Sequence, residues 1–594
     1  MEKETAKQGI IKGAMILATA SFISKIVGML YRIPVTNILG DAGNGIYSQA
    51  YNIYAMLLTL SAVGIPSAIS KLVSERIAVG AYRDAQRVYK IAMVYSAAVA
   101  AILAMGMWTG AGVISQAMVK DASLTMPIKA LAPTIVVVTI MAVMRGYFQG
   151  MNNMAPSGIS QVIEQIVNAI FSVVLAYLFI GRGVEAAATG STLGTGLGAF
   201  AGLLFMMFVY YLISGKMKKR IKNSKEYTYQ SSRKILKLIL ITTIPIVIST
   251  SVFSLMTNID SFMLARMLPD SIAYLQSHGL LQNLPITDVM QVGMQSMDKA
   301  IPFFIEPNPV AMRYISDKGL MATSLTGLEA SIQSFVQSAE ITKILVGQYF
   351  GKYFTLVNVP VSLILTMGTA AIPAIAMAMS LGDIKEVKKK TRMILKIGML
   401  LAVPAAIGLA LFGKPIMAVI FANEPDGGEL LAYGAVSIIF ITIAQLTAGV
   451  LQGMGRQKIP TIHAIIACVI KVIFNVILLS IPTLHIYSVI HSTTLCYMIY
   501  AFLNVLYLKR ELDMKFNWKA LFVKPLISAG IMGAISYGIY RLLCHWIPKE
   551  GLWLLLVIPL AAAVYGIVGL VTGTITKRDI ENIPGGKKII NRLF

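Results

Sequence analysis

Long apolar stretches separated by short polar connections run along almost the entire chain. The first covers about residues 10–39 and is long enough to cross a bilayer, because a helix rises about 1.5 Å per residue against a hydrocarbon core of about 30 Å. Hydropathy predicts about fourteen such spans. They lie near residues 9–38, 44–74, 88–115, 127–150, 154–180, 184–213, 236–267, 346–379, 393–413, 430–453, 459–481, 486–508, 520–542 and 552–574. The pattern therefore predicts an all-α polytopic membrane protein.

The distribution of Lys and Arg predicts the orientation of these spans. With the N-terminus in the cytoplasm, 36 of the 51 Lys and Arg residues fall in cytoplasmic segments and 12 fall in exterior segments. This asymmetry is the positive-inside bias of a many-span protein, and it accounts for the net charge of +24 without a nucleic-acid partner. Both termini are therefore expected in the cytoplasm.

The composition excludes several classes of protein. Of the residues, 56% are hydrophobic and only 13% are charged, whereas about a quarter of the residues of soluble domains are charged. The first span is too long for the apolar region of a signal peptide and lacks a small-residue cleavage site. The three cysteines, Cys468, Cys496 and Cys544, are scattered and predict neither a disulfide framework nor a zinc site.

Two halves of the chain resemble each other at a separation of 303 residues. The element Gln149–Met151 recurs as Gln452–Met454, and a second echo, at a separation of 307 residues, pairs residues 58–70 with residues 365–377. A six-helix unit is thus predicted to occur twice, in spans 1–6 and 7–12, followed by two further helices. A parallel repeat of this kind is expected to enclose a central cavity, with a substrate site between the two lobes near the bilayer midplane.

We divide the chain accordingly into three regions. The N-terminal lobe with a basic cytoplasmic linker covers residues 1–233, the C-terminal lobe covers residues 234–510, and the last two spans with the tail cover residues 511–594. Residues 269–342 form an exterior insertion in the second lobe, where the first lobe has a short turn. A loop this long is often functional, so we interpret it either as a lid or partner-binding site or as a passive elaboration.

The sequence lacks the motifs of enzymes and of nucleotide-driven pumps. The stretch Gly408–Lys414 resembles a phosphate loop, but Pro415 replaces the required Ser or Thr and no strand precedes it. Four glycines spaced by four residues, from Gly190 to Gly202, favour close helix packing over dinucleotide binding. Because no metal-ligand or catalytic-triad spacing occurs either, we expect neither an enzyme nor a cofactor.

Five ionisable residues lie inside predicted spans, where a charge is expensive. They are Lys25 and Arg32 in the first span, Glu164 in the fifth, Asp260 in the seventh and Lys471 in the eleventh. Glu164 lies four residues before residue 168, the repeat equivalent of Lys471, and therefore on the same helix face. Two interpretations stay open, namely an ion pair between the lobes and a site for substrate or coupling ion. Arg32, in the outer half, is also long enough to snorkel.

Several motifs resemble those of one family of transporters. FISKIVGMLYRIPVTNILGDAGNGIYSQAYNIY at residues 22–54, LVNVP at 356–360 and LQGMGRQKIPT at 451–461 resemble bacterial oligosaccharide flippases. With its two six-helix lobes and two additional helices, the chain resembles the polysaccharide transporter group of the multidrug/oligosaccharidyl-lipid/polysaccharide (MOP) exporter superfamily. Within that group it is most similar to the Gram-positive proteins that include stage V sporulation protein B and the MurJ-like lipid II flippases.

The resemblance implies alternating access and, as cargo, an undecaprenyl-pyrophosphate-linked saccharide, first of all lipid II, moved to the outer leaflet of the bacterial cell membrane. In the family, cations on helices 1, 2 and 8 face the pyrophosphate. Lys25 matches one of them through its Ser-Lys-x-x-Gly motif, and Arg32 lies one residue from the second. Lys71 and Lys352 match the others approximately. The last two helices hold the lipid tail in the lipid II flippases, so spans 13 and 14 are expected to do so here.

Without a nucleotide site, the energy is expected to come from the membrane potential or from an Na⁺ or H⁺ gradient. Glu164, Asp260 and Lys471 are the candidate coupling or cavity residues. Three alternatives are kept: an exporter of another lipid-linked polysaccharide precursor, a cation-coupled drug antiporter of the same superfamily, and a non-transporting scaffold that binds a protein partner through residues 269–342. An excess of cations over acids at membrane depth favours the flippase over the antiporter.

Overall fold

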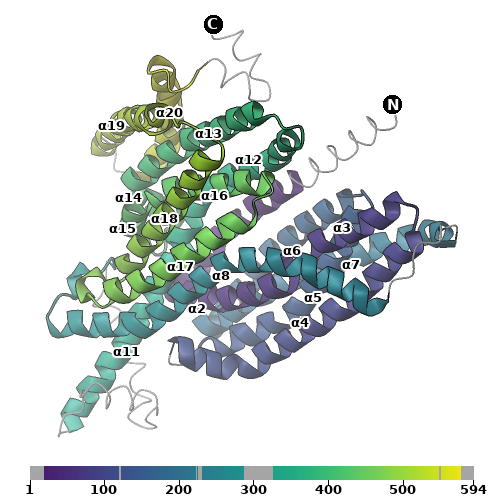
Figure 1. Ribbon diagram of the computed structural model, residues 1–594. Coiled ribbons are helices and arrows are strands. Elements are labelled where there is room, and N and C mark those ends of the chain that lie inside the picture. Colours follow the sequence, from purple (N-terminus) through teal and green to yellow (C-terminus); the bar gives the residue numbers. More distant parts are fainter. Residues whose placement is uncertain are drawn as a thin grey trace. The chain divides into compact units, whose positions relative to one another are not determined.

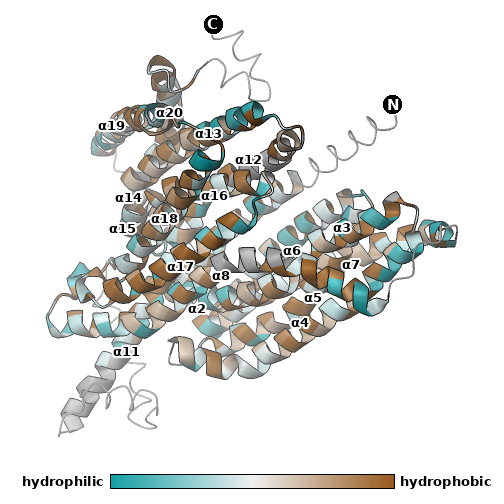
Figure 2. Cartoon of the chain, in the orientation of Figure 1, coloured by the Kyte–Doolittle hydropathy of each residue, from teal (hydrophilic) through white to brown (hydrophobic). Residues whose placement is uncertain are grey.

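The structure is a computed structural model, and it describes residues 19–119, 122–222, 224, 231–286, 325–546 and 550–576 (Figure 1). Helices make up nearly all of these ranges, which contain no strand. Ten of the described helices are long and apolar enough to cross a membrane, or eleven if α15 (Gly428–Gly434) and α16 (Ser437–Gly453), which are bent by 50°, form one span. Figure 2 shows hydrophobic residues along such helices. The predicted all-α multi-pass membrane protein is confirmed, whereas the number fourteen stays a prediction.

The chain divides into two compact units, which we describe separately. Unit 1 comprises residues 1–274 and 290–347, and unit 2 comprises residues 275–289 and 348–594. The helices of unit 1 are a short helix over Thr19–Leu30, α2 (Arg32–Leu58), α3 (Ile65–Ala78), α4 (Tyr82–Val119), α5 (Thr125–Gly150), α6 (Ala155–Phe179), α7 (Val184–Lys222), α8 (Ser232–Ser277) and α11 (Leu325–Gly347).

Unit 2 contains most of the remaining helices. They are the π-helical turn η4 (Gln348–Tyr353), α12 (Phe354–Ser380), α13 (Ile384–Leu411), α14 (Gly413–Ile420), α15, α16, α17 (Lys458–Leu479), α18 (Tyr487–Glu511), the π-helical turn η6 (Lys519–Val523), α19 (Lys524–Trp546) and α20 (Glu550–Val571). The three regions that we derived from the sequence divide the chain at other points and stay a prediction.

A turn at Gly40 folds the first two predicted spans into a hairpin. Gly40, inside α2, has φ 63° and ψ −178°, a conformation that is essentially restricted to glycine. Two contacts bridge the turn at increasing distance from it. The Asn44 amide donates to the Thr36 hydroxyl over 3.3 Å, and the Tyr31 and Tyr47 hydroxyls lie 3.5 Å apart. The predicted boundary between residues 38 and 44 is therefore confirmed.

The internal repeat is visible in both helix boundaries and helix pairing. α5 ends at Gly150 and α6 begins at Ala155, and 303 residues later α16 ends at Gly453 and α17 begins at Lys458. In unit 1, α3 packs on α4 and α5, α4 packs on α5, and α7 packs on α5 and α6. In unit 2, α12 packs on α13 and α16, α13 packs on α16, and α18 packs on α16 and α17. The predicted repeat of a helical unit is confirmed.

The glycines spaced by four residues on α7 bring it into backbone contact with α6. A methyl group added at Gly194 would lie 2.3 Å from the Ser172 nitrogen, and one added at Gly198 would lie 2.5 Å from the Glu164 carbonyl oxygen. Neither position has room for a side chain, because real contacts of this kind are about 3.5–4.0 Å. The packing interpretation of the glycine spacing is therefore confirmed.

Apolar side chains fill the interior of each unit and also remain on its surface. Ile135 in unit 1 and Leu508 in unit 2 are fully buried within apolar clusters. In contrast, Ile170 of α6 is 54% exposed, and its repeat equivalent Ile473 of α17 is 52% exposed. Exposed apolar faces of this kind are expected where lipid replaces water as the solvent.

The helices on both sides of the predicted insertion are longer than the sequence suggested. α8 continues past the predicted end at residue 267 to Ser277, because Leu268, Ile272 and Leu275 are fully buried. α11 begins at Leu325 and packs on α2, where a methyl group at Gly45 would lie 2.3 Å from the Lys343 carbonyl oxygen. Residues 287–324 of the insertion lie outside the described residues.

Candidate functional site

The short helix Thr19–Leu30 and residue Tyr31 meet a polar face of α6. The Ser21 hydroxyl donates to the Gln161 side-chain oxygen over 2.9 Å, and a methyl group at Gly28 would lie 3.0 Å from the Gln165 side-chain oxygen. Farther along, the side-chain amide of Asn168 donates to the Tyr31 hydroxyl over 3.4 Å. Residue numbers rise together along these contacts, so the first helix and α6 run in the same direction. This is expected for the first and fifth spans, which are predicted to cross the membrane in the same direction.

Lys25 lies on the side of its helix that meets α6. It follows Ser21 by four residues and precedes Gly28 by three, and these spacings place the three residues on one helix face. Its side chain is exposed. Glu164 occupies the matching stretch of α6, between Gln161 and Gln165. The predicted cation and the predicted acid therefore lie on two helices of unit 1 that contact each other.

Arg32 packs against a row of tyrosines on the second arm of the hairpin. Tyr47, Tyr51 and Tyr54 follow each other at spacings of four and three residues on α2, with ring centroids 5.9 Å and 5.7 Å apart. The Arg32 guanidinium carbon lies 5.8 Å from the centre of the Tyr51 ring, within the range of a cation–π contact. This contact favours a fixed position inside unit 1 over a snorkelling side chain.

Glu164 has its partner within its own unit. Its carboxylate accepts a hydrogen bond from Arg145 Nη2 of α5 over 2.8 Å, in an ion pair whose side chains are only 12% (Arg145) and 21% (Glu164) exposed. Arg145 Nε donates to the Ser160 hydroxyl over 2.8 Å, and the Ser157 hydroxyl donates to the Arg145 carbonyl over 3.2 Å. Arg145 therefore ties the hairpin of α5 and α6 together.

Charged residues of unit 1 lie on α2, α5, α6 and the first helix, and Tyr51 connects two of them, because it contacts Arg32 and lies within electrostatic range of Glu164. Glu164 is close enough to Tyr51 and Tyr54 to act on both hydroxyls electrostatically. We refer to Lys25, Arg32, Arg145 and Glu164 together as the unit 1 charge cluster. It contains three cations and one acid, so its net charge is positive and suits an anionic ligand.

Lys71 and Asp260, the other predicted site residues of unit 1, lie in different surroundings. Lys71 is exposed on α3. Asp260 is buried on α8 beside Ser261, whose hydroxyl accepts a hydrogen bond from the Asn52 side chain over 3.1 Å. Asn258 donates to the Asn52 carbonyl over 3.0 Å, so this stretch fastens α8 to α2.

The two predicted cations of unit 2 are both buried. Lys352, in η4, is fully buried, and its ammonium group donates to the carbonyl oxygens of Glu424 and Asp426 in the loop between α14 and α15. It also lies 5.6 Å from the centre of the Phe421 ring. Lys471 is 3% exposed on α17. In this conformation Lys352 is bound by its own unit.

Sequence reasoning missed the tyrosine row and the partner of Glu164. The spacing of Tyr47, Tyr51 and Tyr54 is a helix-face pattern that was available as a signal. The sequence favours a structural role for Arg145 in the hairpin of α5 and α6, but its pairing with Glu164 did not follow, because nothing in a single sequence says that two residues 19 positions apart on antiparallel helices meet. Among the described residues, no group of three or more His, Cys, Asp or Glu side chains is arranged to hold a metal ion.

Two family models match different parts of the chain. The model "Polysaccharide biosynthesis protein" matches residues 10–286, and the model "Lipid II flippase MurJ" matches residues 353–557. Two relatives from Bacillus subtilis (strain 168) are similar along nearly their whole length. Stage V sporulation protein B is 24% identical over 99% of both chains, and Lipid II flippase MurJ is 25% identical over 95% of both chains.

Solved structures show the same fold. An inward-facing multidrug resistance MATE family transporter of the MOP superfamily has a TM-score of 0.60 at 14% identity, covering 82% of this chain and 94% of that one. Lipid II flippase MurJ in an inward closed conformation has a TM-score of 0.57 at 13% identity, covering 93% of this chain and 98% of that one. The matched family models and relatives are thus transport proteins rather than enzymes, and the chain is similar along most of its length to the polysaccharide transporter group of the MOP exporter superfamily.

Proposed function

We propose that this protein is a flippase for an undecaprenyl-pyrophosphate-linked saccharide, and that lipid II, the peptidoglycan precursor, is its cargo. It moves the headgroup from the inner to the outer leaflet of the bacterial cell membrane by alternating access, with both termini in the cytoplasm. The observation that carries the proposal is the unit 1 charge cluster, in which Lys25, Arg32 and Arg145 outnumber Glu164. The relatives named as lipid II flippase and as stage V sporulation protein support the class of cargo.

The charge cluster supplies what a pyrophosphate needs inside a membrane. The headgroup carries negative charge and does not enter hydrocarbon unaided, since a single charge at the bilayer centre costs at least about 2.5–3.5 kcal/mol. Partly buried cations stabilise it through charge-assisted hydrogen bonds, which are about twice as strong as neutral ones. Lys25 is the direct ligand in this proposal because its side chain is exposed on the face that meets α6.

Arg32, Lys71 and Lys352 have secondary roles in the proposed cycle. Arg32 is held against Tyr51, so it contributes positive electrostatic potential to the site and does not bind the headgroup directly. Lys71, exposed on α3, meets the headgroup on entry. Lys352 contacts the pyrophosphate only in a conformation in which it has left the carbonyl oxygens of Glu424 and Asp426.

The membrane potential or an Na⁺ or H⁺ gradient drives the cycle, and Glu164, Asp260 and Lys471 are the proposed coupling residues. Glu164 is engaged by Arg145 in this conformation, so ion binding there requires that the pair opens. Replacing Glu164 and Asp260 together by Gln and Asn is expected to abolish gradient-driven flipping in vesicles. Undiminished flipping by that double variant contradicts the coupling role.

A second candidate function is drug and cation antiport, which the likeness to the MATE family transporter favours. An antiporter for cationic drugs needs acids at the ligand, whereas the unit 1 charge cluster has an excess of cations. Export of another lipid-linked polysaccharide precursor is the nearer alternative, because stage V sporulation protein B and MurJ are matched at almost the same identity. A protein partner for residues 269–342 stays a prediction.

Rescue of a flippase-depleted bacterium tests the proposal. Expression of this chain is expected to restore growth and externally accessible lipid II, and the Lys25→Ala variant at equal membrane abundance is expected to fail. Absence of rescue by the intact chain, when it is correctly inserted, contradicts lipid II as cargo. Transfer of teichoic or capsular precursors in the same assay then identifies the other polymer.

A further inference from the structure

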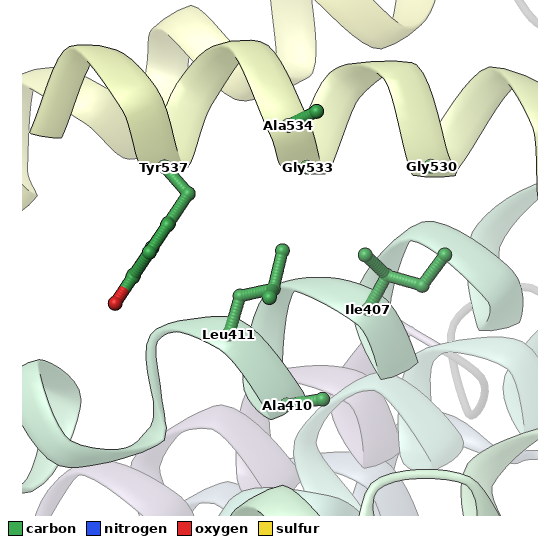
Figure 3. Close-up of a pocket in the computed structure, with 7 residues that line it drawn as sticks. All are labelled: Ile407, Ala410, Leu411, Gly530, Gly533, Ala534 and Tyr537. Atoms are coloured by element: carbon green, nitrogen blue, oxygen red, sulfur yellow. The ribbon is translucent and has the colours of Figure 1, made fainter.

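An apolar groove lies between α13 and α19 in unit 2 (Figure 3). Its volume is about 410 Å³, and its lining comes from Ile407, Ala410 and Leu411 of α13 and from Gly530, Gly533, Ala534 and Tyr537 of α19. Figure 3 shows Tyr537 of α19 and Ile407 and Leu411 of α13 pointing into the space between the two helices. Except for the Tyr537 hydroxyl, the lining offers no polar group, so a hydrocarbon chain is the ligand that it suits.

Two glycines shape this groove in different ways. A methyl group at Gly533 would lie 2.7 Å from Leu411 Cδ1, so Gly533 sets the close approach of the two helices. A methyl group at Gly530 would meet nothing within 4 Å, so Gly530 leaves the groove open. At the far end, the Phe412 ring lies 5.9 Å from the Tyr537 ring in an edge-on arrangement and bounds the groove.

A basic and aromatic segment immediately precedes α19 and continues into its first residue. Residues 515–524, KFNWKALFVK, contain three lysines and no acid, and we refer to them as the collar. Trp518 is 53% exposed and lies 5.8 Å from the Phe516 ring and 5.5 Å from the Phe522 ring. Exposed tryptophan is typical of the membrane–water interface, and the positive-inside rule places these lysines on the cytoplasmic side.

The distance between the collar and the groove matches one lipid leaflet. Lys519 is exposed at the start of η6, the π-helical turn that leads directly into α19, and it precedes Gly530 by eleven residues, so it stands at the N-terminal base of the helix that carries Gly530. Eleven residues of helix span about 16 Å, and half of the hydrocarbon core is about 15 Å thick. A lipid phosphate at Lys519 therefore places its chain beside Gly530.

We propose that the groove between α13 and α19 binds one acyl chain of an anionic glycerophospholipid, with the lipid phosphate at Lys519 of the collar. The groove volume lies near the lower end of ligand pockets, about 300–1,000 Å³, and suits one chain better than a long polyprenyl tail. The site is distinct from the pair α19 and α20, which pack on each other. Because its ligand is a membrane lipid, the proposal holds whatever the cargo is.

Lipid retention by the purified full-length protein tests the site. The protein is equilibrated with phosphatidylglycerol and phosphatidylcholine of equal chain length, and bound lipids are counted by native mass spectrometry. We expect a preference for phosphatidylglycerol of about five-fold or more, the effect of one lysine at a membrane surface. Lys519→Gln is expected to lower the preference for phosphatidylglycerol about five-fold. Lys385→Gln, an exposed control at the start of α13, is expected to leave that preference unchanged.

Filling the groove tests the chain-binding part. Gly530→Leu is expected to lower retention of both lipids, and Gly538→Leu, where a side chain also meets nothing within 4 Å, serves as the matched control. Equal retention by the two leucine variants overturns the proposal, and so does an unselective wild type. Displacement of phosphatidylglycerol by an equal amount of undecaprenyl pyrophosphate also overturns it and assigns the groove to the cargo. If Gly530→Leu does not fold, the Lys519→Gln result decides.

Discussion

The hairpin of α5 and α6 in unit 1 and the hairpin of α16 and α17 in unit 2 have the same boundaries but different interiors. Arg145 and Glu164 form an ion pair in the first hairpin. At the equivalent positions, 303 residues later, the second hairpin has Ala448 and Ala467, which are 4% and 0% exposed. One fold thus accommodates either a charge pair or two methyl groups at the same place.

This difference indicates that the ion pair is not a requirement of the fold. Burying a charge pair costs desolvation free energy, and apolar residues of suitable volume often replace such a pair without loss of stability. Since unit 2 builds the hairpin with alanines, we propose that the charges of unit 1 serve the site rather than the fold. The repeat therefore serves as an internal control for deciding which polar residues of unit 1 carry function.

The largest effect is expected from Lys25, an exposed cation on the first helix of unit 1, which lies outside both hairpins. Lys25→Ala is expected to abolish lipid II flipping, because the ligand that contacts the pyrophosphate is lost. The measurement is externally accessible lipid II in a depletion host, with Lys385→Ala as a control of equal charge change. Full activity of Lys25→Ala would remove Lys25 from the site.

Copying unit 2 into unit 1 separates stability from transport. Arg145→Ala alone leaves Glu164 without its ion-pair partner and is expected to lower the free energy of unfolding by about 2 kcal/mol, below the about 3–5 kcal/mol of a fully buried pair because the side chains are 12% and 21% exposed. The double variant Arg145→Ala/Glu164→Ala is expected to regain most of this stability while transport stays impaired. Thermal unfolding in detergent and the flipping assay measure the two effects.

Two outcomes of these variants would contradict the expectation. If the double variant transports normally, the ion pair has no role in the site. If it is no more stable than Arg145→Ala alone, unit 2 tolerates its alanines through packing that unit 1 lacks.

A smaller effect is expected at the tyrosine row. Tyr51→Leu removes the cation–π contact with Arg32 but keeps apolar volume, and it is expected to weaken flipping about two- to thirty-fold, in line with about 0.5–2 kcal/mol for such a contact. Arg32→Ala is expected to weaken flipping rather than abolish it. A complete loss with Tyr51→Leu and none with Arg32→Ala would mean that the hydroxyl, not the cation, matters.

The smallest effect concerns the turns that follow α6 and α17. Arg182 in the first turn is exposed, whereas its equivalent His485 is buried, and burial lowers the pKa of His485 to about 4. The unfolded chain, with a His pKa of about 6.5, binds more protons between these values, so stability falls as pH drops from about 6.5 to about 4. Thermal unfolding of wild type should lose a few degrees over this range, and His485→Asn should flatten the change. An equal pH dependence in both proteins would contradict the assignment.

The sequence predicted those features that depend on local pattern. The apolar spans, the boundary between the first two of them and the packing role of the glycines from Gly190 to Gly202 all follow from spacing along one chain segment. The 303-residue offset predicted the boundaries of α16 and α17 from those of α5 and α6. The contacts of individual charges did not follow, because they depend on which helices pack together.

Glu164 and Lys352 illustrate that limit. Glu164 was weighed as a partner of Lys471 because the repeat aligns their helices, yet its observed partner is Arg145 on the neighbouring helix. Lys352 was assigned to the pyrophosphate by motif, yet its ammonium group is engaged by backbone carbonyls, which carry no sequence signature. The sequence identifies the ionisable residues whose burial costs free energy. Which groups pair with them depends on tertiary packing.

The turn at Gly40 also bears on how the protein is made. The contacts between Thr36 and Asn44 and between Tyr31 and Tyr47 join residues that are at most 16 positions apart. Contacts that are close in sequence form quickly, and N-terminal segments fold first during synthesis. The half of the charge cluster around Arg32 can therefore assemble once about the first 54 residues have left the ribosome, long before α16 and α17 are translated. An early-formed cationic hairpin then serves as the template on which α6 and α11 dock later.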